Sequence, residues 1–552
     1  MIIDARSLPQ NGTVDTDVCI VGAGVAGITL AREFIREEFR VCLLESGGLS
    51  PDRDTQSLYW GENIGHPYYP LDTARIGGFG GSSNRWGVPL GGHQLGVRLR
   101  PLDEIDFEER DWIPYSGWPF KKADLDPFYE RAQSICRIGP YSYDVKDWET
   151  PGETPRLPIA AGRVKTAIFQ FGSRDTFTGL YRDEITRADN ITTLIHANVL
   201  EAETNATGQN VSRLRIAGVP GKDHWITAKI FVLAMGALET PRLLLLSNRR
   251  QRPGTGNGNG LVGRFFMEHP HLWSGAYIPS DPGIINRTAL YRVHQVNEVP
   301  VMGKLTIAEE VLRREKMLNY CVSIHSKILT DRPNQAPSFK VISWPLLSSN
   351  LSAGCADMDT GGAVSQNSAG AFTSGAGLAV YRKVRRMSGR VVRAFRKKKQ
   401  SVIFQLNHMT EQAPNPDSRV TLGEELDPFG RNRIRLNWKL SPIDIRSIIR
   451  AQEIIDEDLR LSGLGRLQIE LRDEKPPSHL EGGWHHMGTT RMHIDHRKGV
   501  VDEHCRVHGI ANLFIAGPSV FPTGGYANPV LTIVALAARL ADHVKATMAR
   551  CP

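Results

Sequence analysis

The feature of this sequence that most restricts its fold is the N-terminal segment 16–48, TDVCIVGAGVAGITLAREFIREEFRVCLLESGG. The apolar run Val18–Val21 predicts a buried strand, and Gly22-x-Gly24-x-x-Gly27 follows it directly. A second apolar run, Val41–Leu44, predicts another strand and ends at Glu45. Between the two runs, apolar residues recur at helical spacing: Ile28, Leu30, Ala31, Phe34 and Ile35. The segment therefore predicts a strand, a tight turn, an amphipathic helix and a second strand.

The three glycines and the acid of this segment fit a dinucleotide-binding unit. Gly22 would make the tight turn, Gly24 would let the backbone approach a pyrophosphate, and Gly27 would let the helix pack closely on the strand. The pyrophosphate would lie at the helix N-terminus, where free N–H groups and the helix dipole favour an anion. Glu45 is placed to accept a hydrogen bond from a ribose hydroxyl. The segment alone does not decide between FAD and NAD, and an ordinary glycine-rich turn is the alternative.

Length and composition indicate an ordinary globular protein with two structural lobes. The chain has 552 residues, of which 41% are hydrophobic and 23% are charged. No apolar run approaches 18 residues, so the sequence predicts no membrane-spanning helix. The first residues show no signal peptide, and the seven cysteines show no tight spacing. We expect a cytoplasmic protein, with the periplasm as the alternative if a partner subunit carries the export signal.

The positive charge is local. Residues 382–399 hold ten Lys and Arg and no acid, which exceeds the net charge of +8 of the whole chain. This argues against a nucleic-acid-binding surface, which spreads its basic residues along a folded groove. Residues 352–379 are rich in Gly, Ala and Ser, and 380–399 have the pattern of an amphipathic basic helix. The stretch 352–399 is therefore a candidate mobile lid, and 380–399 could instead contact a partner subunit or a membrane surface or remain a solvated helix.

Four further segments carry recognisable patterns. Residues 77–92, GGFGGSSNRWGVPLGG, hold seven glycines, too many for a packed element, and predict a loop that lies against something flat. Residues 231–248 predict a buried strand, a turn at Gly236 and a helix. Residues 401–412 alternate as a strand does, with Val402, Phe404 and Leu406 on one face. Near the C-terminus, Pro529 precedes an apolar helix predicted over Leu531–Val544.

These segments together resemble one enzyme family. The N-terminal glycines with Glu45, the GGSS loop, ALETPRLLLLS, EQAPNPDSRVTL (411–422), HHMGTTRM (485–492) and GYANPVLTIVALAARLAD (525–542) resemble the glucose–methanol–choline (GMC) oxidoreductases. They occur in family order and cover nearly the whole chain. Within the family, the chain resembles pyranose oxidases and bacterial glycoside 3-oxidases and 3-dehydrogenases, because it has Trp86 in the glycine loop and Asn528 in the last motif.

The resemblance implies an α/β fold (α+β overall) with bound FAD. A Rossmann-like FAD-binding domain is expected from 1–95, 185–275 and 475–552. A substrate-binding domain built on an antiparallel β-sheet is expected from 96–184 and 276–474, which include the candidate lid and basic helix at 352–399.

The resemblance also implies site residues. Oxidation of an alcohol by FAD needs a base for the hydroxyl proton, and a neutral histidine suits that role near pH 7. His485 matches the family's catalytic histidine, and the adjacent His486 is the alternative, although we expect its ring to face away from the flavin. Asn528 would donate a neutral hydrogen bond to the same hydroxyl. The expected substrate contacts are Gln405, His485 and Asn528, with a half-buried structural role as the alternative for Gln405.

The cofactor contacts implied by the resemblance come from both ends of the chain. The N-terminus of the last helix would face the flavin pyrimidine, where negative charge develops on reduction. Some pyranose oxidases link FAD covalently through a histidine where this chain has Arg85, so we expect non-covalent FAD. Arg85 would then face the flavin or a phosphate, or pair with a carboxylate. The expected cofactor-binding residues are Gly22, Gly24, Gly27, Glu45, Gly81, Ser82, Ser83, Asn84, Trp86, Val199, Gly236, Gly517, Asn528 and Pro529.

The sequence therefore predicts an FAD-dependent oxidoreductase that converts a secondary ring hydroxyl (C2 or C3) of a sugar or glycoside to a ketone. The electron acceptor would be O₂, or a quinone or cytochrome partner if the protein is a dehydrogenase. A flavin-dependent lyase or a non-redox binding protein is the alternative of a different class. Six histidines between 485 and 508 raise the question of a metal, but their spacing fits no regular site, so we expect none.

Overall fold

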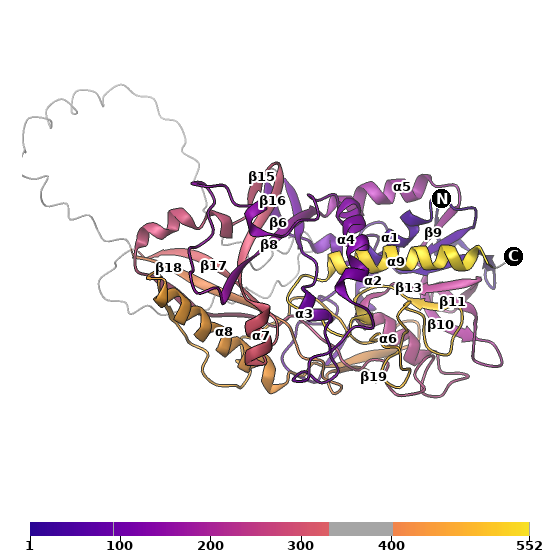
Figure 1. Cartoon of the computed structure of the whole chain (residues 1–552). Coiled ribbons are helices and arrows are strands. Elements are labelled where there is room, and N and C mark those ends of the chain that lie inside the picture. Colours follow the sequence, from indigo (N-terminus) through magenta and orange to yellow (C-terminus); the bar gives the residue numbers. More distant parts are fainter. Residues whose placement is uncertain (92, 330–400, 551–552) are drawn as a thin grey trace, which may run out of the picture.

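The computed structural model describes residues 1–91, 93–329 and 401–550. A parallel sheet forms the centre of the lobe that holds both chain termini (Figure 1). Each strand in it pairs in parallel with its neighbours. In spatial order the strands are β1 (Ile2–Asp4), β9 (Ile191–Ile195), β4 (Val41–Leu44), β3 (Val18–Val21), β13 (Ile230–Leu233) and β22 (Leu513–Ile515). The sheet therefore gathers strands from three distant stretches of the chain.

Helices cover this sheet and connect its strands. The predicted turn and helix after β3 are confirmed, because α1 (Val25–Glu33) begins directly after Gly24 and buries Ile28 and Leu30 completely. The C-terminal helix α9 (Val530–Met548) packs beside α1, as the long yellow helix in Figure 1 shows. Two further helices complete this layer: α4 (Lys122–Cys136) and α5 (Tyr181–Arg187).

A second, smaller sheet shares the core of this lobe. Leu214 and Ile216 on its strands belong to the same buried cluster as Val18 on β3. Its strands are β10 (Asn198–Thr204), β11 (Val211–Val219), β12 (Lys222–Thr227) and β2 (Thr13–Asp15). The predicted turn and helix after β13 are also confirmed, since α6 (Gly236–Leu246) follows it and packs against β10. A third sheet lies against α6 and consists of β19 (Arg419–Leu426), β20 (Asn432–Asn437) and β5 (Gly61–Asn63).

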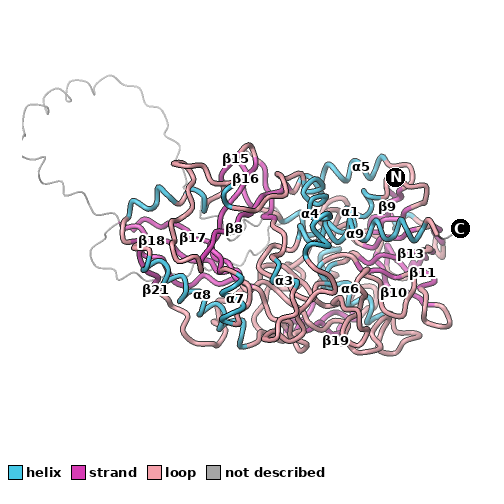
Figure 2. Tube along the Cα trace, viewed as in Figure 1, coloured by secondary structure: helices cyan, strands magenta, loops and turns pink. Residues whose placement is uncertain are grey.

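The other lobe is built on a large antiparallel sheet (Figure 2). Its strands, in spatial order, are β21 (Gly465–Gln468), β14 (His271–Pro279), β18 (Ser401–Thr410), β17 (Tyr320–Leu329), β16 (Val299–Ile307), β8 (Val164–Ser173), β7 (Gln94–Leu99) and β6 (Val88–Gly91), with β15 (His294–Val296) beside β16. The helix α8 (Pro442–Leu461) packs on one face of this sheet. Shorter helices are α2 (Arg53–Ser57), α3 (Glu104–Phe107) and α7 (Glu309–Glu315).

The alternation predicted for 401–412 shows which side chains point to each face of this sheet. Phe404 and Leu406 are buried in one cluster with Ile445 and Ile448 of α8. Residues at odd positions therefore point to the opposite face, because side chains alternate along a strand. From that face, Arg98 on β7 and His271 on β14 reach the cavity described below. The sheet thus has an apolar face under α8 and a more polar face toward the cavity, which also carries a small apolar cluster with Phe169 and Met409.

Two features differ from the sequence expectation. The glycine-rich segment 77–92 is not one open loop, because it contains a short 3-10 helix over Gly81–Arg85 and the edge strand β6. The helix α4 lies within 96–184, the stretch expected in the substrate domain, yet its Tyr129 belongs to the same core cluster as α9. The division into domains therefore stays a prediction. No helix within 1–91, 93–329 or 401–550 is both long and apolar enough to cross a membrane. The candidate lid at 352–399 lies outside the described residues.

Candidate active site

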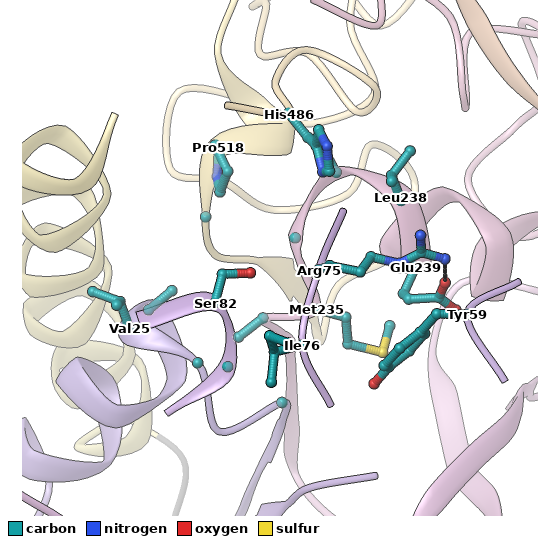
Figure 3. Close-up of a pocket in the computed structure, with 18 of the residues that line it drawn as sticks. Val25, Tyr59, Arg75, Ile76, Ser82, Met235, Leu238, Glu239, His486 and Pro518 are labelled. Atoms are coloured by element: carbon teal, nitrogen blue, oxygen red, sulfur yellow. Dashed lines mark hydrogen bonds and ion pairs between the residues drawn. The ribbon is translucent and has the colours of Figure 1, made fainter. Parts of the chain in front are cut away.

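A deep cavity runs from the N-terminus of α1 to the polar face of the large sheet. Figure 3 shows Val25 of α1 and Ser82 of the glycine loop on one side of the cavity, and His486 on another. The start of α9 also contributes to the wall. Elements from both ends of the chain therefore meet around one space.

The glycines of the first motif divide between two roles. A Cβ on Gly24 would meet no atom within 4 Å, so this residue faces open space in front of α1. A Cβ on Gly27 would lie 1.9 Å from the carbonyl oxygen of Gly22, so Gly27 keeps the helix close to the turn. Gly22 and Gly24 line the cavity and Gly27 does not. As N-cap, Gly24 has no side chain to occupy the free N–H groups of the first helical turn, which leaves an anion site there.

Glu45 joins three backbone segments at the edge of the cavity. Its Oε1 accepts hydrogen bonds from the N–H groups of Gly47 and Gly78, both at 2.9 Å, and its Oε2 accepts one from Ala23 at 3.0 Å. Burial raises the pKa of Glu45, against the effect of these backbone donors. The carboxylate therefore holds the first glycine turn and the second glycine loop together. Its contact with a ribose hydroxyl stays a prediction.

Most of the other predicted cofactor residues line the same cavity: Gly81, Ser82, Ser83, Trp86, Val199, Gly236, Gly517, Asn528 and Pro529. Asn84 differs, because it is not among the lining residues and its amide donates to the carbonyls of Phe79 and Gly81. It shapes the loop from within. Arg85 lines the cavity and also donates to the carbonyl oxygen of Thr73.

A chain of buried ion pairs that the sequence did not reveal forms another part of the wall. The guanidinium of Arg75 points at the carboxylate of Glu239 on α6, as Figure 3 shows. Glu239 also pairs with Arg242 at 3.2 Å, and Arg242 pairs with Asp427 at 2.6 Å. These residues come from three segments far apart in sequence, so no local pattern signals their pairing.

His485 and Asn528 meet at the end of the cavity near the large sheet. The Nε2 of His485 lies 3.0 Å from Nδ2 of Asn528. Burial lowers the pKa of His485 well below its ordinary value, and the neighbouring His269 and His271 lower it further. The imidazole is therefore neutral at pH 7 and offers a nitrogen lone pair. This is the protonation state that a general base needs.

Backbone hydrogen bonds hold the segments at this end of the cavity in position. Met267 and Met487 exchange two hydrogen bonds of 3.0 Å, which sets the segment before β14 beside the histidine motif. Next to Met267, Oε2 of Glu268 accepts hydrogen bonds from the N–H groups of His269, Gly483 and His485, at 2.9 to 3.1 Å. Burial raises the pKa of Glu268 to about 7. Sequence reasoning missed Glu268, which fixes the backbone of the motif.

His486 lies on the cavity wall as well, which differs from the expectation that its ring faces away. Its Nε2 is 2.8 Å from the hydroxyl of Tyr68, which also hydrogen-bonds to Glu268. Burial lowers the pKa of His486 to about 3. His486 is thus held by Tyr68, whereas His485 is the histidine that contacts Asn528.

Several buried polar atoms on the cavity wall have no hydrogen-bond partner among the described residues. Among them are Oδ1 of Asn528, Nε1 of Trp484 and both ring nitrogens of His271. Leaving such groups unpaired is costly, about 1–3 kcal/mol each, unless a bound group supplies partners. FAD fits this cavity, because it brings a pyrophosphate for the glycine turn and a flavin edge rich in donors and acceptors. The N-terminus of α9 lies on the same wall through Pro529 and Val530.

The structure also shows the positions of Gln405 and of the histidines that follow the motif. Gln405 is half-buried on β18, opposite Ala276 and His325, and is not among the cavity-lining residues. Its substrate role stays a prediction. The histidines after the motif do not gather at one point, because His508 lies beside His493 and His496, whereas His504 stacks on His543 at 4.6 Å. Within the described part of the chain, no group of three or more His, Cys, Asp and Glu side chains is arranged to hold a metal ion.

The chain is similar to several known oxidoreductases. Residues 414–537 match the family model described as GMC oxidoreductase. The chain is 24% identical to paromamine 6′-oxidase of Streptomyces fradiae, over 96% of this chain and 91% of the relative. It is 34% identical to C-glycoside 3-oxidase of Microbacterium trichothecenolyticum over 122 residues, which are 22% of each chain.

The fold is also that of a solved flavoenzyme. Formate oxidase of Aspergillus oryzae superposes with a TM-score of 0.52 at 15% identity, covering 98% of this chain and 99% of that one. The predicted fold class, a Rossmann-like FAD-binding domain with a sheet-based substrate domain, is thereby confirmed. The motifs, the cavity and these comparisons lead to one conclusion: the chain is an FAD-dependent oxidoreductase whose residues 414–537 match the glucose–methanol–choline (GMC) oxidoreductases.

Proposed function

We propose that this protein oxidises a secondary ring hydroxyl (C2 or C3) of a sugar or glycoside to the ketone. The observation that carries the proposal is the pairing of a neutral His485 with Asn528 on the wall of the cavity that fits FAD. The relative named C-glycoside 3-oxidase supports a glycoside as the substrate class and a ring carbon as the position. Trp86 adds an aromatic surface on which a sugar ring packs well.

The residues of the chain perform the proton transfer and the positioning. Bound FAD supplies the two-electron oxidant that takes the hydride from the carbinol carbon. Nε2 of His485 accepts the hydroxyl proton as the carbonyl bond forms. The amide of Asn528 hydrogen-bonds to the same oxygen and orients the hydroxyl, which is how a cavity holds a reactant in one geometry. One proton and one hydride leave the substrate, which balances the two-electron oxidation to a ketone.

FAD is expected to be released when the protein is precipitated with acid. The position that carries the linking histidine in some pyranose oxidases is Arg85, whose guanidinium forms no histidyl–flavin bond. The measurement is the absorbance of the supernatant near 450 nm after precipitation, with a protein that contains histidyl-linked flavin treated in parallel. Yellow colour that stays in the pellet would contradict the prediction of non-covalent FAD.

The proposal is tested by anaerobic mixing of the holoenzyme with a panel of sugars, glycosides and simple alcohols. We expect a sugar or glycoside with free ring hydroxyls to bleach the flavin. Of its 2-deoxy and 3-deoxy analogues, the one that lacks the oxidised hydroxyl should leave the colour unchanged. Bleaching by simple primary alcohols alone would overturn the proposed substrate class. Admission of air then reports the acceptor, because rapid return of the colour indicates an oxidase and slow return indicates a quinone or cytochrome partner.

A further inference from the structure

His269 occupies a position behind the catalytic pair that the sequence analysis did not single out. It lies two residues before the start of β14, next to Pro270, and its side chain is fully buried. Its Nε2 is 3.3 Å from the carbonyl oxygen of Gly524. Its Nδ1 is 2.9 Å from Nδ1 of His485, with the two ring planes at 72°. His269 therefore joins His485 to a backbone carbonyl of the loop that leads to Asn528.

These contacts assign the ring protons one after the other. A carbonyl oxygen has no proton to donate, so Nε2 of His269 must carry the hydrogen in its contact with Gly524. Burial lowers the pKa of His269 to about 4, so the ring is neutral and its Nδ1 is a bare acceptor. Nδ1 of His485 must then be the donor in the contact between the two rings. Because His485 is also neutral, its Nε2 is left without a proton.

We propose that His269 is a positioning residue that holds His485 in the tautomer whose Nε2 is free to accept the substrate proton. The inference rests on the proposed role of His485 as the base and adds the residue that keeps the base ready. Asn528 does not fix the tautomer, because an amide presents either its oxygen or its NH₂ group to the ring. The carbonyl of Gly524 is the partner in this chain that accepts and never donates.

The surroundings hold this arrangement in place. Glu268 accepts hydrogen bonds from the backbone N–H groups of both His269 and His485, so the two rings keep their relative register. The ionisable groups that face the pair from other elements are His271 on β14, Arg98 on β7, Lys304 on β16, Glu411 after β18 and the adjacent His486. The ring centroid of His271 lies 6.1 Å from that of His485. The contact between His269 and His485 is thus the hydrogen bond to the inner nitrogen of the base.

The wild-type protein tests the assignment without any substitution. The holoenzyme would be labelled with ring-¹⁵N histidine, and its long-range ¹H–¹⁵N spectrum would be recorded, with the His485→Ala variant used to assign the His485 signals. We expect a protonated Nδ1 and a bare Nε2 on His485. A protonated Nε2 on His485 in the wild-type protein would overturn the proposal.

Two substitutions separate positioning from packing. His269→Leu removes the acceptor, and we expect it to slow anaerobic flavin reduction by about 10²–10⁴-fold, as loss of a tautomer-fixing partner does elsewhere, with FAD content unchanged. His269→Asn keeps an amide oxygen near the place of Nδ1, and we expect it to restore the rate to within about 10-fold of wild type. The ¹⁵N spectra should follow the rates, with Nε2 of His485 protonated in the leucine variant.

The outcomes distinguish this proposal from the proposed function. If His269→Leu reduces as fast as wild type while His485→Ala is slow, the positioning role of His269 is wrong and the base stands. If His485→Ala itself reduces at the wild-type rate, the proposed function loses its base. If His269→Leu and His269→Asn are equally slow and the Nε2 of His485 stays bare in both, His269 acts through packing, and the proposal is overturned.

Discussion

Anaerobic reduction of the bound flavin by substrate is expected to slow by about 10²–10⁴-fold in His485→Ala, with FAD still bound. The imidazole of His485 contacts Asn528 and is neutral because burial lowers its pKa. Without it, the hydroxyl has no histidine at this position to accept its proton. The measurement is stopped-flow absorbance at saturating substrate, together with the ratio of FAD to protein.

Two matched variants identify the base. Asn528→Ala should reduce the rate less, because it removes an orienting hydrogen bond and leaves the proton acceptor. His486→Ala should reduce the rate least, since that ring is bound to Tyr68 and not to Asn528. If His486→Ala is the slow variant and His485→Ala is fast, the base is His486. If all three variants reduce at wild-type rates, the base lies elsewhere.

The pH profile of the wild-type enzyme follows from the same pKa. A pKa lowered by burial means that His485 stays neutral, and able to accept a proton, below the ordinary range of histidine. The rate of flavin reduction is therefore expected to be flat through pH 6.5 and to fall only at lower pH. A reductive rate that falls through pH 6.5 would contradict the neutral buried base.

Substitution of the two neighbouring glycines is expected to separate cofactor binding from folding. In Gly24→Val the new side chain enters open space in front of α1, so the apoprotein should keep its thermal stability and lose FAD. In Gly27→Val the Cβ would meet the carbonyl oxygen of Gly22 at 1.9 Å, and the helix must move away from the turn. That overpacking should destabilise the fold itself, by about 3 kcal/mol or more.

The comparison uses the ratio of FAD to protein and the unfolding temperatures of the apoproteins. Gly258→Val is the matched control, because Gly258 is an exposed loop glycine with no atom within 4 Å of its Cβ position and is not part of the cavity. It should leave both quantities unchanged. Full FAD content in Gly24→Val would show that the cofactor does not approach this turn, and the assigned pyrophosphate site would be wrong.

The sequence predicts the local elements well, because their signals are local. Apolar periodicity and a boundary glycine or proline stand in consecutive residues for three elements. They are the strand, glycine turn and helix at 18–33, the helix after Gly236 and the C-terminal helix after Pro529. The edge strand β6 was missed because glycines dominate its surroundings, although Val88 and Leu90 alternate and are buried. The packing of α4 on α9 was missed because the sequence of neither helix indicates which helix it packs against.

The site was predicted in part for the same reason. His485, Asn528 and the glycine turn carry motifs, whereas the residues that support them act across the fold. Glu268 and His269 reach the motif through the pairing of Met267 with Met487, a contact across 220 residues that no periodicity encodes. The available signal was the Glu-His-Pro sequence at 268–270, in which ionisable residues precede a buried strand.

Single-turnover stoichiometry tests the central claim most directly. Holoenzyme would be mixed anaerobically with a slight excess of a glycoside that bleaches the flavin, and the carbohydrate would be identified by NMR after the protein is removed. We predict one ring ketone, at C2 or C3, for each FAD that is reduced, and almost none from His485→Ala in the same time. An aldehyde at the primary carbon would contradict the proposed position. An elimination product formed while the flavin stays oxidised would contradict the oxidation itself.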